Sequence, residues 1–459
     1  MYIDETKLNQ LLTDRTLHDT VRIKEALARA EELKGLELAD LAALTHISDP
    51  ELTARLFEAA RRAKNEIYGR RMVLFAPLYV SSLCGNECLY CTFRAGNRGA
   101  VRRTLTRQEI SAEVAALVEQ GHKRVLLVSG EEYPEQGFSW LLDAIETIYA
   151  TSRGTGQVRR VNLNVAPLAT DAFRLLANAR IGTYQLFQET YHRPTYAAMH
   201  PSGRKKDFDW RALAMHRAME AGIHDVGIGA LFGLYDWRFE LLAMMQHIQE
   251  LEQVYGIGPH TISVPRLEPA DGSSIACRPP APVSDTEFRK IIAILRLAVP
   301  YTGIIISTRE TPEIRRDSFA LGVSQLSAGS STTPGGYAVA PDQAEAAQFS
   351  LGDHRTLDEV IRDLALHDYI PSFCTGCYRL GRVGADFMDL ARPGAIKEHC
   401  DPNALSTFME YLLDYASPAT KAVGLPLVER LISGMAGGPG ATARRLVAAV
   451  ASGKRDVYC

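Results

Sequence analysis

The sequence predicts an α/β protein whose core is a (β/α)8 barrel of the TIM type, with a helical N-terminal extension and a mostly helical C-terminal domain. From Met72 to about Ala328, short apolar runs typical of buried strands alternate with amphipathic stretches typical of helices. About eight strands alternating with helices over roughly 260 residues favour a closed barrel over an open doubly wound sheet. The expected strands lie near residues 72–80, 124–129, 158–165, 181–188, 224–231, 260–266, 301–307 and 321–328. The expected helices lie near residues 106–120, 137–150, 169–179, 209–221, 238–255, 284–299 and 311–319.

The barrel is predicted to span residues 71–330, between two segments of different character. Residues 1–70 have the pattern of a helical extension, in which Asp19–Lys34 shows helical periodicity and ends at a glycine. After the barrel, a loop rich in Gly, Ser, Thr and Pro (Gly329–Gly336) interrupts the alternation. It leads into residues 331–459, a mostly helical C-terminal domain.

Composition excludes several classes of protein. The 459 residues carry a formal net charge of −3 with a pI near 6.5, which leaves no basic surface suited to nucleic acid. No apolar run is long enough to cross a bilayer, and the first residues do not have the pattern of a signal peptide. We therefore expect a cytoplasmic protein that binds neither nucleic acid nor a membrane.

Six of the eight cysteines form two tight groups. The groups are Cys84, Cys88, Cys91 and Cys374, Cys377, Cys400. Structural disulfides rarely join cysteines that cluster within a few residues, and grouped cysteines in a cytoplasmic chain indicate ligation of a metal or an iron–sulfur cluster. Cys277 and Cys459 stand alone, and no role is assigned to them.

The first group has the spacing of a cluster with one open iron. In Cys84-Gly-Asn-Glu-Cys88-Leu-Tyr-Cys91, directly after the first expected strand, three thiolates can hold three irons of a [4Fe-4S] cube. The open iron can bind the methionine moiety of S-adenosylmethionine (SAM), and one electron then releases a 5′-deoxyadenosyl radical. Zinc is the alternative, but it needs a fourth ligand nearby and no histidine occurs between His46 and His122.

This triplet, with the aromatic Tyr90 before its last cysteine, resembles the signature of the radical SAM superfamily, whose members use such a barrel. The resemblance makes Tyr90 a candidate for cofactor contact. Ser129-Gly130-Glu131, at the end of the second expected strand, resembles the turn that receives the SAM amino group through backbone carbonyls. Glu189, at the end of the fourth expected strand, is a further candidate for contact with SAM, although a surface ion pair explains it equally well.

The second cysteine group predicts a second cluster. Cys374-Thr-Gly-Cys377, followed after 22 residues by Cys400, again offers three thiolates and an open position. We therefore predict an auxiliary [4Fe-4S] cluster in the C-terminal domain. Structural zinc remains the alternative, because His399 lies next to Cys400 and could supply a fourth ligand.

Joined to a radical SAM barrel, this C-x2-C-x22-C pattern resembles the HydG family of [FeFe]-hydrogenase maturases, which are tyrosine lyases. The resemblance extends over nearly the whole chain, with its motifs in the same order. The matching segments are Phe75–Tyr79, Glu189–Tyr196, Met199–Gly203, His260–Leu267, Gly322–Gly329 and Phe373–Arg379.

The resemblance implies a reaction and its partners. The deoxyadenosyl radical would take a hydrogen atom from the amino group of L-tyrosine, and the Cα–Cβ bond would break to give p-cresol and dehydroglycine. That fragment would yield carbon monoxide and cyanide at the auxiliary cluster. There, a labile extra iron and free cysteine would form the Fe(CO)2(CN) synthon for the hydrogenase H-cluster. The implied partners are a low-potential electron donor such as ferredoxin or flavodoxin, and the hydrogenase maturation scaffold GTPase.

Three further residues are assigned through the resemblance. His260 opens the sixth expected strand, at the barrel end opposite the first cluster, and would bind the extra iron. Arg309 follows the seventh strand and would hold the tyrosine carboxylate bidentately, assisted by Ser307. The simpler explanations are a structural histidine and a helix-terminal ion pair of Arg309 with Glu310 or Glu313.

Two other functions remain open. A 2-iminoacetate synthase of thiamine biosynthesis performs the same tyrosine cleavage without a second cluster, and the C-terminal thiols together with His260 argue against it. A non-catalytic iron–sulfur carrier or scaffold is the alternative from a different class. It would leave the radical SAM signature and Arg309 without a use.

Overall fold

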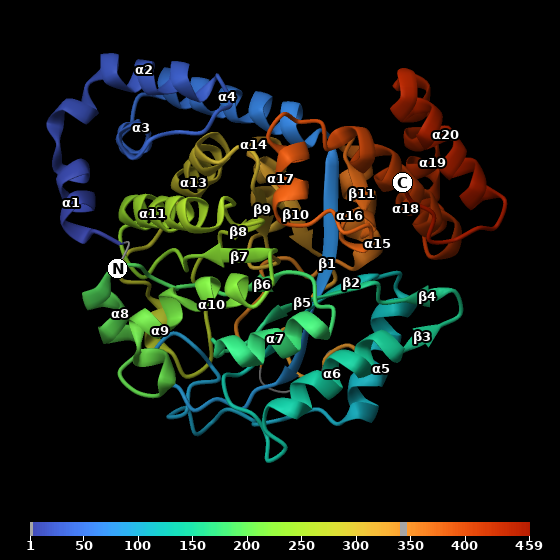
Figure 1. The fold of residues 1–459 in the computed structure, drawn as a ribbon, viewed down its shortest axis with the longest axis horizontal. Helices are drawn as coiled ribbons and strands as arrows, with labels where there is room; N and C mark the ends of the chain where they lie inside the picture. Colours follow the sequence, from blue (N-terminus) through green and yellow to red (C-terminus); the bar gives the residue numbers. More distant parts are fainter. Residues whose placement is uncertain (1–2, 340–346) are drawn as a thin grey trace.

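Eight parallel strands close into a barrel in the computed structural model, which describes residues 3–339 and 347–459 (Figure 1). The barrel strands are β1 (Arg71–Ser81), β2 (Arg124–Ser129), β5 (Arg160–Asn164), β6 (Tyr184–Gln185), β7 (Val226–Gly229), β8 (Thr261–Ser263), β9 (Gly303–Ile306) and β10 (Val323–Ser327). Each strand pairs in parallel with the next, and β10 pairs with β1 from Val73↔Gln325 to Phe75↔Ser327. This closure confirms the predicted fold class.

Helices cover the outside of the barrel, as the alternating pattern predicts. They are α5 (Arg107–Glu119), α6 (Phe138–Ala150), α7 (Thr170–Asn178), α8 (Arg193–Met199), α9 (Phe208–Ala212), α10 (Ala214–Glu220), α11 (Trp237–Tyr255), α12 (Ser274–Cys277), α13 (Asp285–Ala298) and α14 (Pro312–Leu321), with a 3-10 turn at Arg204–Lys206. Helix α5 begins with a capping box in which Thr106 and Glu109 satisfy each other's backbone amides. Such caps set where each helix starts and hence how it packs on the sheet.

The structure differs from the expected elements in three places. Strand β6 is only two residues long, because beyond Gln185 its backbone bonds only to β7 and no longer to β5. The helix expected near 209–221 breaks at Leu213, where the Trp210 carbonyl oxygen accepts a hydrogen bond from Arg217 Nη2 (2.6 Å) that competes with the helical one. A short antiparallel hairpin, β3 (Ser152–Arg153) with β4 (Gly156–Gln157), precedes β5.

The N-terminal residues form helices that pack on α11, α13 and α14 of the outer layer, at the upper left of Figure 1. They are α1 (Glu5–Thr13), α2 (Thr20–Ala30), α3 (Leu38–Thr45) and α4 (Pro50–Tyr68), with a 3-10 turn at Arg15–His18. Helix α2 ends at Ala30, earlier than expected, because Leu33 adopts a left-handed conformation (φ 59°). Among the described residues, no helix combines the length and apolarity needed to cross a membrane.

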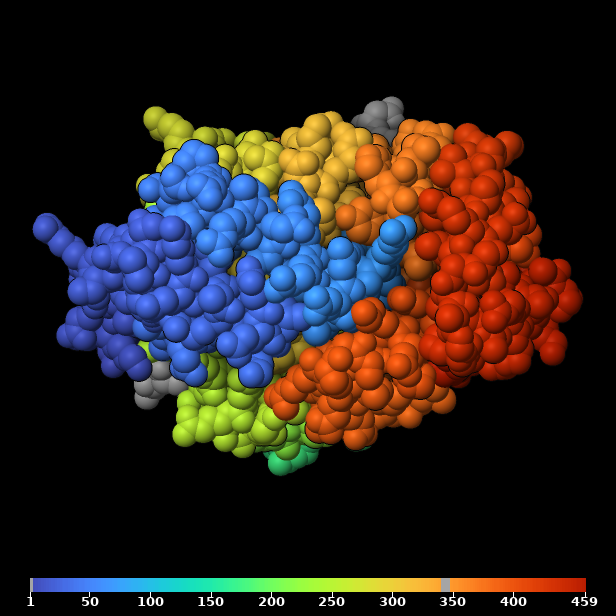
Figure 2. Space-filling model, turned by 90° about the horizontal axis from the view of Figure 1, so that it is seen from above, coloured from blue at the N-terminus to red at the C-terminus, as the bar shows by residue number. Residues whose placement is uncertain are grey.

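The C-terminal part is mostly helical but adds one strand to the sheet. Its elements are α15 (Leu357–Leu366), β11 (Ile370–Ser372), α16 (Gly376–Arg379), α17 (Ala385–Ala391), α18 (Lys397–Asp414), α19 (Pro418–Gly434) and α20 (Gly437–Ala451). Strand β11, which the sequence pattern did not reveal, pairs in parallel with the first residues of β1. Figure 2 shows the molecule from above the view of Figure 1. On this face the N-terminal helices (blue) and the C-terminal part (orange to red) lie next to each other at the surface.

A buried ion cluster fastens α18 to the barrel. Glu410 of α18 pairs with Lys123, next to β2, and with Arg159 (2.9 Å), next to β5, and all three side chains are almost fully buried. Burial acts to raise the pKa of Glu410, but the two cations outweigh it and lower the pKa to about 2. The C-terminal part is therefore held by charge as well as by apolar packing.

We predict that Glu410→Ala lowers the free energy of unfolding by roughly 3–5 kcal/mol, because it leaves the buried Lys123 unpaired and Arg159 with Asp456 (3.1 Å) as its remaining carboxylate. Urea unfolding measures this, with Glu429→Ala, an exposed glutamate of α19, as the matched control. The pKa of Glu410 is depressed from 4.5, so its contribution should be complete above pH 4.5 and disappear as the pH falls towards 2. An unfolding free energy for Glu410→Ala equal to that of the control would contradict the assignment.

Candidate active site at the carboxyl end of the barrel

Three thiols follow β1 at the carboxyl end of the barrel. Cys84, Cys88 and Cys91 lie in the loop after Ser81 and line one cavity of about 190 Å³. The same cavity is lined by the ends of the other barrel strands, as expected for a TIM-type barrel. All ten residues predicted for this site line it: Cys84, Cys88, Tyr90, Cys91, Ser129, Gly130, Glu131, Glu189, Ser307 and Arg309.

The environment of these thiols suits thiolates bound to a metal cluster better than free thiolates. Burial raises the pKa of each, so that a free thiolate would be costly in this place. An iron–sulfur cluster would deprotonate the thiols and compensate for the lost hydration. The three thiols and the cavity between them therefore fit the predicted [4Fe-4S] cluster, with Cys84, Cys88 and Cys91 as its ligands.

Arg102 holds the cysteine loop in shape. Its guanidinium donates hydrogen bonds to the carbonyl oxygens of Ser82 (3.1 Å), Phe93 (2.6 Å) and Arg94 (2.6 Å), on both sides of the cysteines. Sequence reasoning did not identify Arg102, because its partners are main-chain atoms and leave no mark in the sequence.

Gly130 brings β2 against the same loop. Its amide donates to the Ser81 carbonyl oxygen (2.9 Å), and a Cβ at this position would lie 1.9 Å from the Leu83 carbonyl oxygen. Only glycine permits this approach. The adjacent Ser129 hydroxyl is buried and has no hydrogen-bond partner in the described chain, which leaves it available to a bound group.

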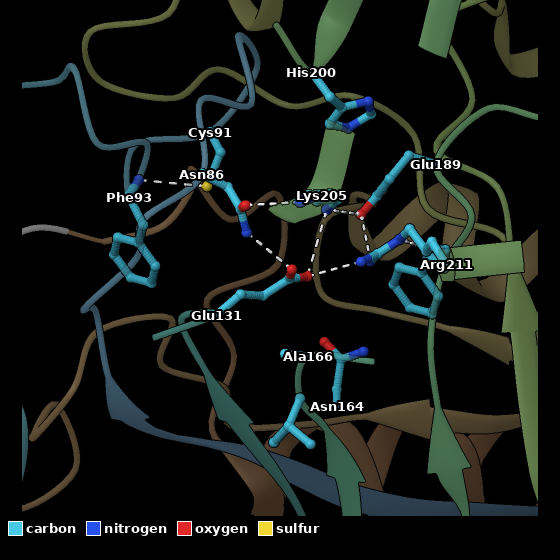
Figure 3. A network of polar contacts seen from close by, with 12 residues as sticks. Asn86, Cys91, Phe93, Glu131, Asn164, Ala166, Glu189, His200, Lys205 and Arg211 are labelled. Carbon is cyan, nitrogen blue, oxygen red and sulfur yellow. Dashed lines mark hydrogen bonds and ion pairs between the residues drawn. The ribbon is translucent and has the colours of Figure 1, made fainter. Parts of the chain in front are cut away.

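A buried network of four charges lines one wall of the cavity (Figure 3). Lys205 Nζ lies 2.7 Å from Glu189 Oε1, and Arg211 bridges Glu131 (2.8 Å) and Glu189 (3.4 Å). Asn86, inside the cysteine loop, donates to Glu131 (2.9 Å). Glu189 is thus part of a buried network, which corrects the alternative of a surface ion pair.

The network keeps its carboxylates ionised. Burial acts to raise the pKa of Glu131 and of Glu189, but Arg211 and Lys205 outweigh it and lower both. Burial and Arg211 act to lower the pKa of Lys205, yet Cys88 and the two carboxylates raise it overall. Lys205 and Arg211, which sequence reasoning missed, therefore stay cationic beside the cysteine loop and present fixed charges to a polar cofactor.

Glu189 is held in an unusual backbone conformation. Its φ is 72°, in the left-handed region that a glutamate rarely adopts. The turn is fastened by Glu240 of α11, which accepts hydrogen bonds from the Thr190 hydroxyl and from the Tyr191 amide (2.8 Å). Tyr90, the aromatic of the triplet, is buried nearby, with its hydroxyl 2.7 Å from His200 Nε2.

Arg309 lies on another side of the cavity and has no carboxylate partner in the described chain. Its guanidinium stacks on the Phe349 ring (3.3 Å to the centroid) and contacts the Arg266 carbonyl oxygen at 3.5 Å. Glu310, the partner considered as the simpler explanation, instead pairs with Arg266, and Glu313 pairs with Arg316. The helix-terminal ion pair is therefore absent among the described residues, and Arg309 faces the cavity with Ser307.

The second cysteine group lines a separate cavity, of about 50 Å³, at the amino end of the barrel. Cys374, Cys377 and Cys400 line it together with His260, which directly precedes β8. A hydrogen bond from the Cys400 thiol, assisted by nearby arginines, lowers the pKa of Cys377 to about 6. The structure thus brings together every residue predicted for the second site, whereas His399 does not line the cavity.

His260 is placed as a neutral base. Burial lowers its pKa to about 4, although Asp225, whose Oδ1 lies 3.6 Å from His260 Nδ1, opposes the shift. The ring packs on Phe387 (4.4 Å between centroids), and Nδ1 has no hydrogen-bond partner in the described chain. A neutral imidazole with an unused nitrogen suits a metal ligand.

Arginines distinguish the second cavity from the first. Four of them line it: Arg71, Arg124, Arg160 and Arg382. Arg160 pairs with Asp225 (3.1 Å), but buried Arg71 makes no hydrogen bond or ion pair with its side chain in the described part of the chain. A buried cation that has no ion pair among the described residues suits a group of negative charge, such as a cluster held by three thiolates.

The eight cysteines, all within the described residues, are free thiols. No group of three or more His, Cys, Asp or Glu side chains in residues 3–339 and 347–459 is arranged to hold a single metal ion. Cys277 is exposed, and Cys459 lies near the second site, where its carbonyl oxygen accepts from Arg382 (2.7 Å).

Comparison with known proteins agrees with this arrangement. Residues 78–245 match the radical SAM superfamily, and residues 263–370 match the Biotin and Thiamin Synthesis associated domain. The chain is 32% identical over 356 residues to the 2-iminoacetate synthase of Escherichia coli (strain K12), covering 77% of this chain and 91% of that protein.

Two solved structures resemble the whole chain. The crystal structure of HydG, a maturase of the [FeFe]-hydrogenase, has a TM-score of 0.96 and 43% identity, with 100% of both chains covered. The FeFe-hydrogenase maturase HydG from Carboxydothermus hydrogenoformans has a TM-score of 0.85 and 39% identity, with 96% of this chain and 97% of that chain covered.

We predict that Gly130→Ala displaces the cysteine loop, because the added Cβ overlaps the Leu83 carbonyl oxygen. The loss should be at least about tenfold in SAM affinity, since a displacement of the order of an ångström disturbs a preorganised site. Equilibrium binding of SAM to the reconstituted protein measures it. Gly434→Ala in α19, where a Cβ meets nothing within 4 Å, is the matched control and should bind SAM normally. Equal affinities in the two variants would contradict the role of Gly130.

Proposed function

We propose that this chain, which belongs to the HydG family of radical SAM enzymes, cleaves L-tyrosine and uses the fragment to build an iron carbonyl–cyanide synthon for the [FeFe]-hydrogenase. The observation that carries the proposal is the pair of thiol-lined cavities at opposite ends of one barrel. One fits the cluster and SAM that the superfamily implies. The other has a ligand set of three thiols and a neutral imidazole.

The first cavity is suited to an amino acid substrate and a radical reaction. When bound, the [4Fe-4S] cluster and SAM supply a 5′-deoxyadenosyl radical. Arg309, free of carboxylate partners in the described chain, would hold the tyrosine carboxylate, with Ser307 beside it. The barrel strands surround the cavity, which would limit the access of water to a reactive intermediate. Cleavage of the Cα–Cβ bond would give dehydroglycine and a radical of the side chain, and this radical would become p-cresol when it takes up one electron from the electron donor and a proton.

The second cavity is suited to collecting the products of dehydroglycine. Cys374, Cys377 and Cys400 would hold an auxiliary [4Fe-4S] cluster, and His260 would bind a labile extra iron. Carbon monoxide, cyanide and a free cysteine would assemble there. The surrounding arginines favour this use, because cyanide and a cysteine carboxylate are anions.

The competing function is that of a 2-iminoacetate synthase, which the identity with the Escherichia coli enzyme favours. It would use only the first cavity. The buried second cavity, in which three thiols and a histidine meet, would then serve no purpose. A non-catalytic carrier would likewise make no use of Arg309.

The test is to incubate anaerobically reconstituted, reduced protein with SAM and L-tyrosine. We expect 5′-deoxyadenosine, p-cresol and carbon monoxide, and about eight or more irons for each chain. About four irons, with p-cresol but no carbon monoxide, would favour the synthase. A carrier would form neither 5′-deoxyadenosine nor p-cresol.

We further predict that Cys377→Ala distinguishes the activity of the first cavity from that of the second. It should retain p-cresol formation, because the first cavity is untouched, and lose carbon monoxide together with about half of the iron. The matched control is Cys277→Ala, because Cys277 is exposed and lines neither cavity. This control should retain p-cresol formation, carbon monoxide formation and its full iron content. Carbon monoxide at the control level in Cys377→Ala would refute the assignment of the second site.

A further inference from the structure

Glu268 is an acidic side chain in the first cavity that the reaction described above does not use. It lies in the loop after β8, at the carboxyl end of the barrel, and lines the cavity together with Arg309 and Ser307. In the described part of the chain its carboxylate receives no hydrogen bond and forms no ion pair. A half-buried carboxylate without a partner in a substrate cavity indicates a contact that a ligand completes.

The neighbouring charges leave Glu268 and Arg309 as a complementary pair. Arg266 pairs with Glu310 through a two-pronged contact that includes 2.9 Å from Nε to Oε1, and it also pairs with the more exposed Asp285 (2.9 Å). Its charge is therefore already satisfied by the protein. Arg309 and Glu268 influence each other electrostatically, yet no hydrogen bond joins them. Among the residues that the structure describes, one unpaired cation and one unpaired anion therefore line the same cavity.

An amino acid in its zwitterionic form matches this arrangement. Its carboxylate suits the fork of the Arg309 guanidinium, which Phe349 orients by stacking. Its ammonium group, one carbon away, suits a carboxylate on the other side of the cavity. We infer that Glu268 binds the α-amino group of the substrate and accepts a proton from it before the hydrogen atom is removed. This inference rests on the proposed function and names a residue for one step of it.

The step is a simple proton transfer. One N–H bond of the ammonium group breaks, its electron pair stays on nitrogen, and the proton forms an O–H bond on Glu268, with no change of oxidation state. The neutral amine keeps two hydrogen atoms, and its lone pair stabilises the nitrogen radical that loss of one of them creates. An ammonium group has no such lone pair, so the proton must leave first.

The environment of Glu268 suits a base that works near neutral pH. Burial and the charge of Glu310 raise its pKa to about 7, while Arg309 and Arg266 oppose the shift. Glu189 and Lys205 also line the cavity but are paired with each other. A base is most effective when its pKa lies near the working pH. Turnover of the natural protein should therefore rise as the pH passes through about 7 and then level off.

The decisive experiment compares Glu268→Gln with the natural protein at saturating SAM and tyrosine, between about pH 6 and about pH 9. At pH 7 the variant should form p-cresol roughly 100-fold more slowly, which is the usual range for loss of a general base. Its rate should then climb about tenfold per pH unit, because solution supplies more of the neutral amine at higher pH. Glu268→Asp, which keeps the carboxylate, should restore part of the rate at pH 7.

A second measurement does not depend on turnover. Glu268→Gln should weaken equilibrium binding of tyrosine about tenfold but leave unchanged that of 3-(4-hydroxyphenyl)propanoate, which lacks the amino group. Glu313→Gln, a surface substitution away from the cavity, is the matched control for both measurements.

The outcomes separate this inference from the proposed function. If the natural protein makes no p-cresol, the proposed function fails. If it does, and Glu268→Gln keeps the same pH profile and the same preference for tyrosine, only the role of Glu268 fails. A decrease of equal size at every pH would likewise overturn proton transfer, since it would indicate a structural effect.

Discussion

The pairing of β1 with its neighbours is the interaction on which the rest of the structure depends. This strand pairs with β10 to close the barrel, with β2 along its later residues, and with β11 at its start. Its last residue leads into the loop of Cys84, and its first residue, Arg71, lines the second cavity. Strand β11 ends two residues before Cys374. One strand therefore sets the positions of both thiol groups relative to each other.

The two ends of the barrel handle charge in different ways. At the carboxyl end, Lys205 and Arg211 neutralise Glu131 and Glu189 within one buried network, so the protein supplies both signs. At the amino end, arginines outnumber carboxylates, and Arg71 has no ion-pair partner in the described residues. Buried charge is costly unless it is paired. The surplus of arginines at the amino end would therefore favour an anionic group there, whereas the buried network at the carboxyl end is already balanced.

The proposed selectivity of the first cavity for an amino acid would arise from the charges that the protein leaves unpaired there. Arg266 is taken up by Glu310 and Asp285, and this leaves Arg309 without a carboxylate and Glu268 without a cation in the described chain. A site with one fixed positive and one fixed negative charge favours a ligand whose anionic group faces the positive charge and whose cationic group faces the negative charge. Because both groups are partly desolvated, an uncharged molecule of the same shape would leave them unsatisfied and bind less well.

The sequence by itself determined the fold class and the two thiol groups. Alternating strand and helix patterns predict a closed barrel. The spacing of Cys84, Cys88 and Cys91 is a local property of the sequence and does not depend on how the rest of the chain packs. Parallel strands of a barrel all end at the same mouth, so residues after strands, such as Glu131 and Arg309, could be placed at one site in advance.

Only the tertiary structure decided which charged groups are paired and which are free. Arg102, Lys205 and Arg211 come from loops and a short helix, and their partners lie on other elements or on main-chain carbonyls. The same holds for Glu268, which has no cationic partner in the described chain because the nearby Arg266 pairs with Glu310 instead. Periodicity records only which side of an element is buried. Pairing between distant side chains depends on distances of a few ångströms that are set when the barrel closes, and no local pattern encodes them.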